Sequence, residues 1–266
     1  MDAHTASTAR RAVLAAATIA IAASLALPSP APASPSAAPL AVPILMYHRI
    51  DHLRPGLPLM TRRLTVDPDD FARQMEWLHV HGYHTLTQEQ LLAAATADGG
   101  LPPRPILITF DDGYRDVLGK AAPVLARLKM HATAYVISGR LHGADPSFLT
   151  VPELRALERL GIEIGSHTAT HAALTALGDA QASEELVSSR RVLEAAVGHP
   201  VRWFAYPYGA YDARTAALVA RAGYRLAVTT QPGLCQDAGR PLELRRFEIL
   251  DSTGVGGLAA MLRAGC

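Results

Sequence analysis

Short hydrophobic runs alternate with amphipathic segments along most of the chain. Seven of these runs are four to six residues long and rich in Ile, Val, Tyr and Phe. Runs of this length and composition are typical of buried strands. We therefore predict strands over residues 42–47, 106–110, 133–137, 162–165, 201–206, 226–229 and 247–250.

Signals for helix starts lie between these runs. Asp67 followed by Pro68 fits an N-cap residue and the first helical position, and Phe71, Met75 and Leu78 then fall on one helix face. Further helices are predicted where capping-box pairs or amphipathic spacing occur. These are Thr87 with Gln90, Thr150 with Glu153, and residues 183–197 and 212–222, with Gly223 ending the last.

The alternation of strands and helices predicts one α/β domain built on a parallel sheet, open or closed into a barrel. Residues 138–148 contain Gly, His, Asp and Pro without periodicity, which predicts a loop. No internal repeat and no second domain is evident in the sequence.

The first forty residues differ from the rest. Arg10 and Arg11 precede an apolar run over 12–27, and A-P-A follows at 31–33. This order is typical of a secretory signal peptide over 1–33, and the Pro/Ala/Ser-rich residues 34–41 read as a flexible spacer before a domain over 42–266. An uncleaved anchor is the alternative, although the 16-residue run is shorter than the roughly 20 residues of a membrane span.

Composition narrows the classes of protein. A hydrophobic fraction of 49% and a charged fraction of 18% exclude a disordered chain. A net charge of +1 shows no excess of basic residues of the kind that nucleic-acid-binding proteins carry. Two cysteines exclude a disulfide-dense scaffold or a multi-cysteine zinc module. If the chain is exported, Cys235 and Cys266 could form a disulfide, although two free thiols remain open.

Polar groups follow four of the predicted strands directly. They are His48, the D-D-G sequence at 111–113, His167 with His171 four residues later, and the P-Y-G sequence at 207–209. Active sites of α/β barrels and open α/β sheets lie at the carboxyl ends of the strands. Each motif alone could be a turn or a core histidine, but their coincidence at strand ends favours an active site.

The residue types predict metal chemistry. Two adjacent carboxylates after a buried strand repel each other unless a cation compensates them. One carboxylate and two imidazoles leave open positions on a divalent ion, which is typical of a catalytic site. The second carboxylate is then free to act as a general base, and a further histidine could protonate the leaving group.

Four motifs resemble the polysaccharide deacetylases, carbohydrate esterase family four, which share the NodB-like homology domain. They are T-F-D-D-G at 109–113, S-H-T-A-T-H at 166–171, F-A-Y-P-Y-G at 204–209 and P-I-L-M-Y-H at 43–48. The last is similar to the opening of the subgroup that includes extracellular poly-N-acetylglucosamine deacetylases. The resemblance covers about residues 42–251.

The resemblance implies a distorted (β/α) barrel of about seven strands. It makes Asp111 the general base and implies one divalent metal, usually zinc, in a site that also binds the substrate and its oxyanion. The implied metal ligands are Asp112, His167 and His171; the implied oxyanion and substrate-binding residues are Tyr208, through its backbone N–H, with Pro207 and Tyr206.

The sequence departs from the family pattern at two positions. Many members carry an Arg where this chain has Ala205, and residues 256–266 hold no histidine to supply the usual catalytic acid. The subgroup resemblance offers His48 as the acid and Arg246 as the residue that orients Asp111. A surface salt bridge is an equally good interpretation of Arg246.

We therefore expect a secreted or cell-envelope hydrolase that removes N-acetyl groups from a carbohydrate polymer. The alternatives are an O-acetyl esterase acting on acetylated xylan or a similar glycan, and a catalytically silent carbohydrate-binding protein. The expected partner is the acetylated polysaccharide, with no nucleic acid, no stable membrane insertion after signal cleavage, and a monomeric chain.

Overall fold

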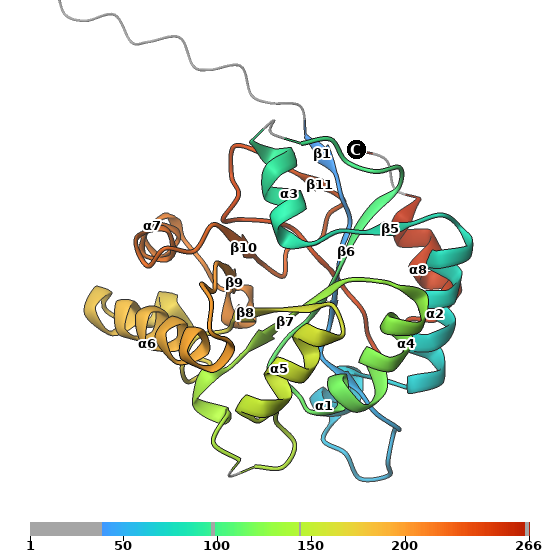
Figure 1. Cartoon of the computed structure of the whole chain (residues 1–266), viewed down its shortest axis with the longest axis horizontal. Helices are drawn as coiled ribbons and strands as arrows, with labels where there is room; N and C mark the ends of the chain where they lie inside the picture. Colours follow the sequence, from blue (N-terminus) through green and yellow to red (C-terminus); the bar gives the residue numbers. More distant parts are fainter. Residues whose placement is uncertain (1–38, 97–98, 144, 264–265) are drawn as a thin grey trace, which may run out of the picture. The chain divides into compact units, whose positions relative to one another are not determined.

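A curled parallel sheet, with seven strands along its main path, forms the centre of the computed structural model (Figure 1). The strand order along this path is β10-β9-β8-β7-β6-β2-β12, and the short β5 (His84–Thr85) also pairs with β6. The sheet and its helices make a half-barrel, which confirms the distorted (β/α) barrel. The strands are β2 (Ile44–Tyr47), β6 (Pro105–Phe110), β7 (Ala132–Val136), β8 (Ile162–Ser166), β9 (Trp203–Ala205), β10 (Leu226–Val228) and β12 (Phe247–Glu248).

The structure describes residues 39–96, 99–143, 145–263 and 266. The expected signal peptide over 1–33 and residues 34–38 of the spacer lie outside these residues. Leu40–Ala41, the last residues of the predicted spacer, form strand β1, which pairs with β11 (Cys235–Gln236). Within the described residues, no helix combines the length and the apolar character needed to cross a membrane.

All seven predicted strands are present, and most are shorter than predicted. Strand β2 begins at Ile44 rather than at residue 42. Pro43 has no backbone N–H to donate to a neighbouring strand, which explains this later start. Strand β9 covers only Trp203–Ala205, and the chain turns at Tyr206 into the 3₁₀ turn η4 (Pro207–Gly209).

Five helices match the predicted ones. The Asp67 side chain accepts from the backbone N–H of Asp69, and both predicted capping boxes are formed. Asp212 and Thr215 form a third capping box. The helices are α2 (Pro68–Val80), α3 (Gln88–Ala95), α5 (Val151–Arg159), α6 (Asp179–Val197) and α7 (Ala213–Arg221).

The sequence patterns missed several elements. Two-residue strands form only because a neighbouring segment offers backbone hydrogen-bond partners, so no local sequence pattern predicts them. The missed strands are β1, β3 (Arg49–Ile50), β4 (Thr65–Val66), β5 (His84–Thr85) and β11, and the missed helices are α1 (Leu59–Arg63), the π-helical turn η1 (Val117–Ala121), α4 (Ala122–Leu128) and α8 (Val255–Leu262). Residues 138–143 and 145–148 lie in the predicted loop, which contains one 3₁₀ turn, η2 (Ser138–Arg140).

The two faces of the curled sheet bury two hydrophobic clusters. Alternate residues of a strand point to opposite faces. On β6, Ile106 and Ile108 pack in the larger cluster with the helices, whereas Leu107 lies in the smaller cluster with Ile44 and Leu226. Burial on both faces explains why the strands read as continuous apolar runs.

One late segment joins the two edges of the sheet. Leu244 bridges to Val228 of β10, and Phe247–Glu248 then pair with β2. Buried Gln236 holds this segment, because it donates to the Arg245 carbonyl and accepts from the Arg245 N–H. Cys235, the residue before Gln236, forms a disulfide with Cys266 and so bonds β11 to residue 266.

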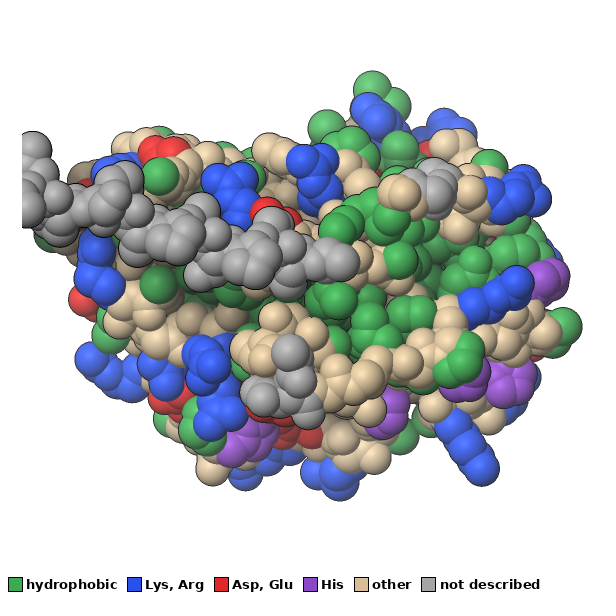
Figure 2. All heavy atoms as spheres, turned by 90° about the horizontal axis from the view of Figure 1, so that it is seen from above, with side chains coloured by type: hydrophobic (Ala, Val, Ile, Leu, Met, Phe, Trp, Pro, Cys, Tyr) green, Lys and Arg blue, Asp and Glu red, His purple; other side chains and the backbone are tan. Residues whose placement is uncertain are grey.

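Strands β2 and β6 run from the top towards the bottom of Figure 1, so their carboxyl ends lie near α1 and the amino ends lie near α3. Figure 2 shows the molecule from above. Hydrophobic side chains gather in its middle and right, and Lys, Arg and His side chains are scattered around them. This view shows no single charged patch, in agreement with the near-neutral composition.

Candidate active site

Neighbouring strands deliver the candidate residues to one end of the sheet. Asp111 and Asp112 follow β6, His48 follows β2, and His167 follows β8. Strand β7 lies between β6 and β8, and β2 pairs with β6 on its other side. The carboxyl ends of parallel strands meet at the same edge, so residues more than one hundred positions apart come together.

Asp112, His167 and His171 form a compact cluster. The Oδ1 atom of Asp112 lies 3.6 Å from Nε2 of His167 and 3.4 Å from Nε2 of His171. All three ligand atoms lie within 4.8 Å of one another, so they could share one ion. In the part of the chain that the structure describes, this is the one group of three such side chains.

The orientation of the two histidines suits metal binding. His167 Nδ1 lies 2.8 Å from the carbonyl oxygen of Ala205, and a carbonyl can only accept, so Nδ1 carries a proton and Nε2 is the nitrogen that faces Asp112. Burial and the neighbouring His167 lower the pKa of His171, which keeps it neutral. Neutral imidazoles and a carboxylate are the donor set of divalent metals such as zinc.

Asp111 is buried and paired with Arg246. The guanidinium donates from Nη1 to Oδ1 and from Nη2 to Oδ2, both at 2.7 Å. Burial alone would raise the pKa of Asp111, but the charge of Arg246 and its hydrogen bonds outweigh it and hold the pKa at about 2. Arg246 is fully buried, which excludes the surface salt bridge as an interpretation.

Arg246 is itself held in place from two sides. Its Nε donates to the Thr229 carbonyl at 2.8 Å, and its Nη1 also reaches Thr109 Oγ1 at 3.1 Å. It stands on the segment that joins the two edges of the sheet. The guanidinium absent at Ala205 is therefore supplied from another part of the chain.

His48 lies near this pair, and its positive form would lower the pKa of Asp111. Its Nδ1 atom is buried and has no hydrogen-bond partner in the described structure. A buried polar atom of this kind is rare, and it is consistent with a group that exchanges protons with a bound molecule.

The turn after β9 presents Tyr208 and buries its neighbours. The Tyr208 ring is 68% exposed, and its centroid lies 4.6 Å from that of His171. Pro207 is buried, and the fully buried Tyr206 ring packs against Phe204. Of the three residues predicted to bind substrate or oxyanion here, the structure thus leaves only the Tyr208 side chain open to a ligand.

Backbone strain gathers at the site. Six described residues other than glycine have positive φ angles, and four of them belong to the motifs: Asp112 (72°), Thr168 (63°), His171 (67°) and Tyr208 (60°). This conformation costs free energy for residues with a Cβ and persists only when the surroundings enforce it. The strain therefore marks the same loops that the sequence motifs select.

Glu185 of α6 is a positioning residue that the sequence did not reveal. Its Oε2 accepts from the backbone N–H groups of Ala169 and Thr170, both at 2.9 Å, and its Oε1 accepts from Thr170 Oγ1 at 2.8 Å. It thereby fixes the loop between His167 and His171. The residue looks like any helical glutamate in the sequence, because the loop it holds is 15 residues away.

Comparison with known proteins adds an independent observation. A family model described as polysaccharide deacetylase matches residues 98–227. The Bacillus subtilis (strain 168) protein YxkH, whose name assigns it to the polysaccharide deacetylases, is 32% identical over 221 residues, which cover 83% of this chain and 75% of YxkH. The chain belongs to the polysaccharide deacetylase family. This result confirms the resemblance drawn from the four motifs.

Two further proteins are similar to this chain. The deacetylase PplD of Streptococcus pyogenes superposes with a TM-score of 0.78 at 28% identity, over 85% of this chain and all of that one. Poly-beta-1,6-N-acetyl-D-glucosamine N-deacetylase of Staphylococcus aureus is 25% identical over 178 residues. This match covers 62% of the chain and 60% of that relative.

Proposed function

We propose that the protein is a secreted, metal-dependent hydrolase that removes N-acetyl groups from a polymer of N-acetylglucosamine. The observation that carries the proposal is the buried Asp111–Arg246 pair directly beside the cluster of Asp112, His167 and His171. An ionised carboxylate next to an ion site is the arrangement needed to deprotonate water beside a Lewis acid.

Asp112, His167 and His171 would hold one divalent ion, with zinc as the proposed metal. When bound, the ion supplies a Lewis acid that polarises the amide carbonyl and acidifies water. Asp111 accepts the proton from the attacking water, and Arg246 keeps Asp111 ionised and oriented. The backbone N–H of Tyr208 donates to the oxygen that becomes negative on the attacked carbonyl.

His48 donates a proton to the departing nitrogen, so that the sugar leaves as an amine and the acetyl group leaves as acetate. The preference for an amide substrate rests on the relatives named poly-beta-1,6-N-acetyl-D-glucosamine N-deacetylase. The same groups could also cleave an acetyl ester, because an alkoxide leaves more readily than an unprotonated amide nitrogen. Substrate choice therefore depends on the walls of the cleft rather than on the reacting groups.

The test is acetate release from N-acetylglucosamine oligomers and from acetylated xylan, each with and without a chelator. We expect release from the oligomers, loss with the chelator, and recovery on adding zinc. Release from xylan alone would replace the amidase with an O-acetyl esterase. Full activity in chelated, metal-free protein would refute the metal-dependent scheme.

Two variants separate the proposed roles of the site residues. His48→Ala should lower kcat by about 10²–10⁴ while the metal content measured by mass spectrometry stays at one ion per chain. Asp112→Ala should lose both the metal and the activity. Unchanged kcat in His48→Ala would remove His48 from the reaction.

The secreted location is proposed from residues 1–33 alone. Arg10 and Arg11 followed by a 16-residue apolar run would direct export, with cleavage after Ala33. N-terminal sequencing of the mature protein from the culture medium should begin at Ser34. We further propose that the mature chain acts as a monomer, which size-exclusion chromatography with light scattering would check.

A further inference from the structure

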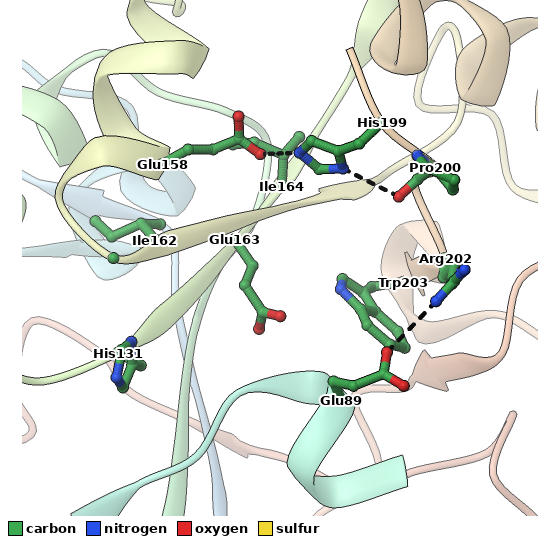
Figure 3. Close-up of a pocket in the computed structure, with 11 residues that line it drawn as sticks. Glu89, His131, Glu158, Ile162, Glu163, Ile164, His199, Pro200, Arg202 and Trp203 are labelled. Carbon is green, nitrogen blue, oxygen red and sulfur yellow. Dashed lines mark hydrogen bonds and ion pairs between the residues drawn. The ribbon is translucent and has the colours of Figure 1, made fainter. Parts of the chain in front are cut away.

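A cavity separate from the candidate active site lies near the amino ends of β8 and β9. It has a volume of about 410 Å³ and is bordered by α3 and by the starts of the two strands (Figure 3). Its wall mixes carboxylates, cations and apolar side chains. The residues used below are Glu89, Glu158, Glu163, His199, Arg202 and Trp203.

Two of its three carboxylates already have a cationic partner. Glu158 Oε1 lies 2.6 Å from Nε2 of His199, and Glu89 Oε2 lies 3.6 Å from Nη1 of Arg202. Glu163 has no cation within ion-pair distance among the described residues. Figure 3 shows its side chain extending away from β8, with His131 to its left and the Glu89 and Trp203 side chains to its right.

Only neutral donors reach the Glu163 carboxylate. It accepts from the backbone N–H of Gln88 at 2.8 Å and from Thr133 Oγ1 at 3.4 Å, and the Trp203 side chain donates to it as well. Burial raises the pKa of Glu163 to about 7, because these neutral hydrogen bonds do not offset the loss of solvent. A bound cation would supply the missing compensation.

A buried polar residue fixes the position of the Glu163 carboxylate. Gln88, whose backbone N–H donates to Glu163, is fully buried, and its Nε2 donates to Tyr135 Oη at 2.7 Å. The donors to Glu163 on this side are therefore held rigidly, and the charge of the carboxylate is left for a ligand on the cavity side to compensate.

The rest of the wall is suited to an organic ligand. Ile162, Ile164, Pro200 and Trp203 line it alongside the charged groups. Pockets for small molecules combine such apolar and aromatic walls with a few placed polar groups. An indole beside a carboxylate also favours an organic ammonium ion, through cation–π attraction.

We propose that this cavity binds the protonated amine of a deacetylated amino sugar, with Glu163 as its counter-ion. The choice of an amino sugar rests on the proposed function, because each removal of an N-acetyl group leaves one primary amine on the polymer. The amine is bonded to a pyranose ring, whose C–H faces match the Pro200 and Trp203 side of the wall.

The bound sugar is a different unit from the one that reacts. Glu163 and His167 are four residues apart, which separates them by about 13 Å along an extended chain at roughly 3.3 Å per residue. The two sites also lie at opposite ends of β8. The cavity would therefore hold the enzyme on polymer that has already been deacetylated.

The test is a binding measurement that does not depend on turnover. The chain has two tryptophans, so Trp77→Phe leaves Trp203 as the reporter beside Glu163. In Trp77→Phe protein kept inactive with a chelator, we would titrate the glucosamine tetramer, the N-acetylglucosamine tetramer and propylamine. We expect a saturable change in Trp203 emission and at least tenfold tighter binding of the glucosamine tetramer than of the other two.

Substitutions in the cavity should move this affinity in opposite directions. Glu163→Gln should weaken binding of the glucosamine tetramer at least tenfold. Arg202→Gln should tighten it severalfold, because Arg202 is a cation at the rim and its loss frees Glu89. Glu184→Gln, an exposed carboxylate on α6, is the matched control and should leave the affinity unchanged. Circular dichroism checks that each variant is folded.

Several outcomes would overturn the proposal. Equal binding of both tetramers would show that the cavity does not select the amine, and unchanged affinity in Glu163→Gln would remove Glu163 as the counter-ion. Propylamine binding as tightly as the glucosamine tetramer would overturn the assignment to a sugar. Acetate release by the wild-type enzyme is measured separately, so a failure of the proposed function is distinguishable from a failure of this cavity.

Discussion

The Asp111–Arg246 pair shows how one residue sets the chemistry of another in this site. A buried carboxylate without a partner would be protonated near neutral pH. The two hydrogen bonds from Arg246 keep it ionised, and burial of both side chains makes each dependent on the other. The pair is thus a structural element as well as part of the proposed base.

Removing Arg246 should therefore destabilise the fold. We expect Arg246→Met to lower the free energy of unfolding by about 3–5 kcal/mol, because Asp111 remains buried with an uncompensated charge. The double variant Asp111→Ala/Arg246→Met should be less destabilised than Arg246→Met alone. Urea unfolding of the metal-free proteins measures both values.

Arg245 provides the control for this experiment. It precedes Arg246, is exposed, and donates to the Pro232 carbonyl. Arg245→Met should cost less than about 1 kcal/mol, as is usual for surface substitutions. Equal losses in the two single variants would show that the buried pair has no special role in stability.

At the scale of elements, helix α6 controls the loop that carries His171. Glu185 is the contact that matters, because it accepts three hydrogen bonds from Ala169 and Thr170. Partners behind metal-binding residues usually change metal affinity by 10–100-fold when they are removed. We predict such a loss in zinc affinity for Glu185→Ala, measured by competition with a chromophoric chelator.

The adjacent Glu184 is exposed, so Glu184→Ala has the same helix propensity change without the loop contact. Its zinc affinity should match that of the wild type. If both variants bind zinc as tightly as the wild type, the loop holds its shape without α6.

Strand β8 carries a second predicted effect, through Glu163. Its pKa is about 7 in the folded protein and 4.5 when unfolded. Below about pH 4.5 both states hold the proton, so the contribution of Glu163 to the free energy of unfolding is fully present. Between pH 4.5 and 7 only the folded state holds the proton, so the free energy of unfolding falls as pH rises. Over this range it falls by about 3 kcal/mol.

The matched variant isolates this contribution. Glu163→Gln removes the titration and keeps the size of the side chain. In metal-free protein, the difference in unfolding free energy between the wild type and Glu163→Gln should change by about 3 kcal/mol from pH 4.5 to 8, in favour of the variant. A difference that is constant across this range would contradict the raised pKa.

At the scale of the whole molecule, the segment over residues 244–248, which joins the two edges of the sheet, links stability to the candidate active site. It carries Arg246, it is held by Gln236, and the neighbouring Cys235 is bonded to Cys266 across a sequence separation of 31. Distant parts of the chain thus meet where the base is oriented.

Loss of the disulfide should therefore lower stability. The entropy of closing a loop of this length corresponds to about 4 kcal/mol. We expect Cys235→Ser/Cys266→Ser to lower Tm by several degrees, measured by differential scanning calorimetry, and a reducing agent to lower the Tm of the wild type alone. An unchanged Tm in the double variant would show that the bond does not restrict the unfolded chain.

The sequence predicted the framework well because its patterns are local. Continuous apolar runs marked all seven strands, and capping residues such as Asp67 and Thr87 marked helix starts. Strand ends were less accurate, since the last residues of a strand depend on whether a neighbour offers hydrogen-bond partners. The two-residue strands β1, β3, β4, β5 and β11 escaped prediction for the same reason.

The candidate site was predicted to the extent that its residues lie within motifs. Asp111, Asp112, His167 and His171 stand at strand ends, where the sequence alone predicts that polar groups converge. Their roles in the reaction remain predictions that the variants above would test.

The amino-acid sequence by itself determined the family, the class of fold and the set of polar residues at the strand ends. It did so because apolar periodicity and motif spacing are properties of neighbouring residues. Only the tertiary structure decided that Arg246 is buried against Asp111, that Glu185 holds the His171 loop, and that Glu163 lines a second cavity. These relations join residues 15 to 135 positions apart, and burial is set by everything that packs around them.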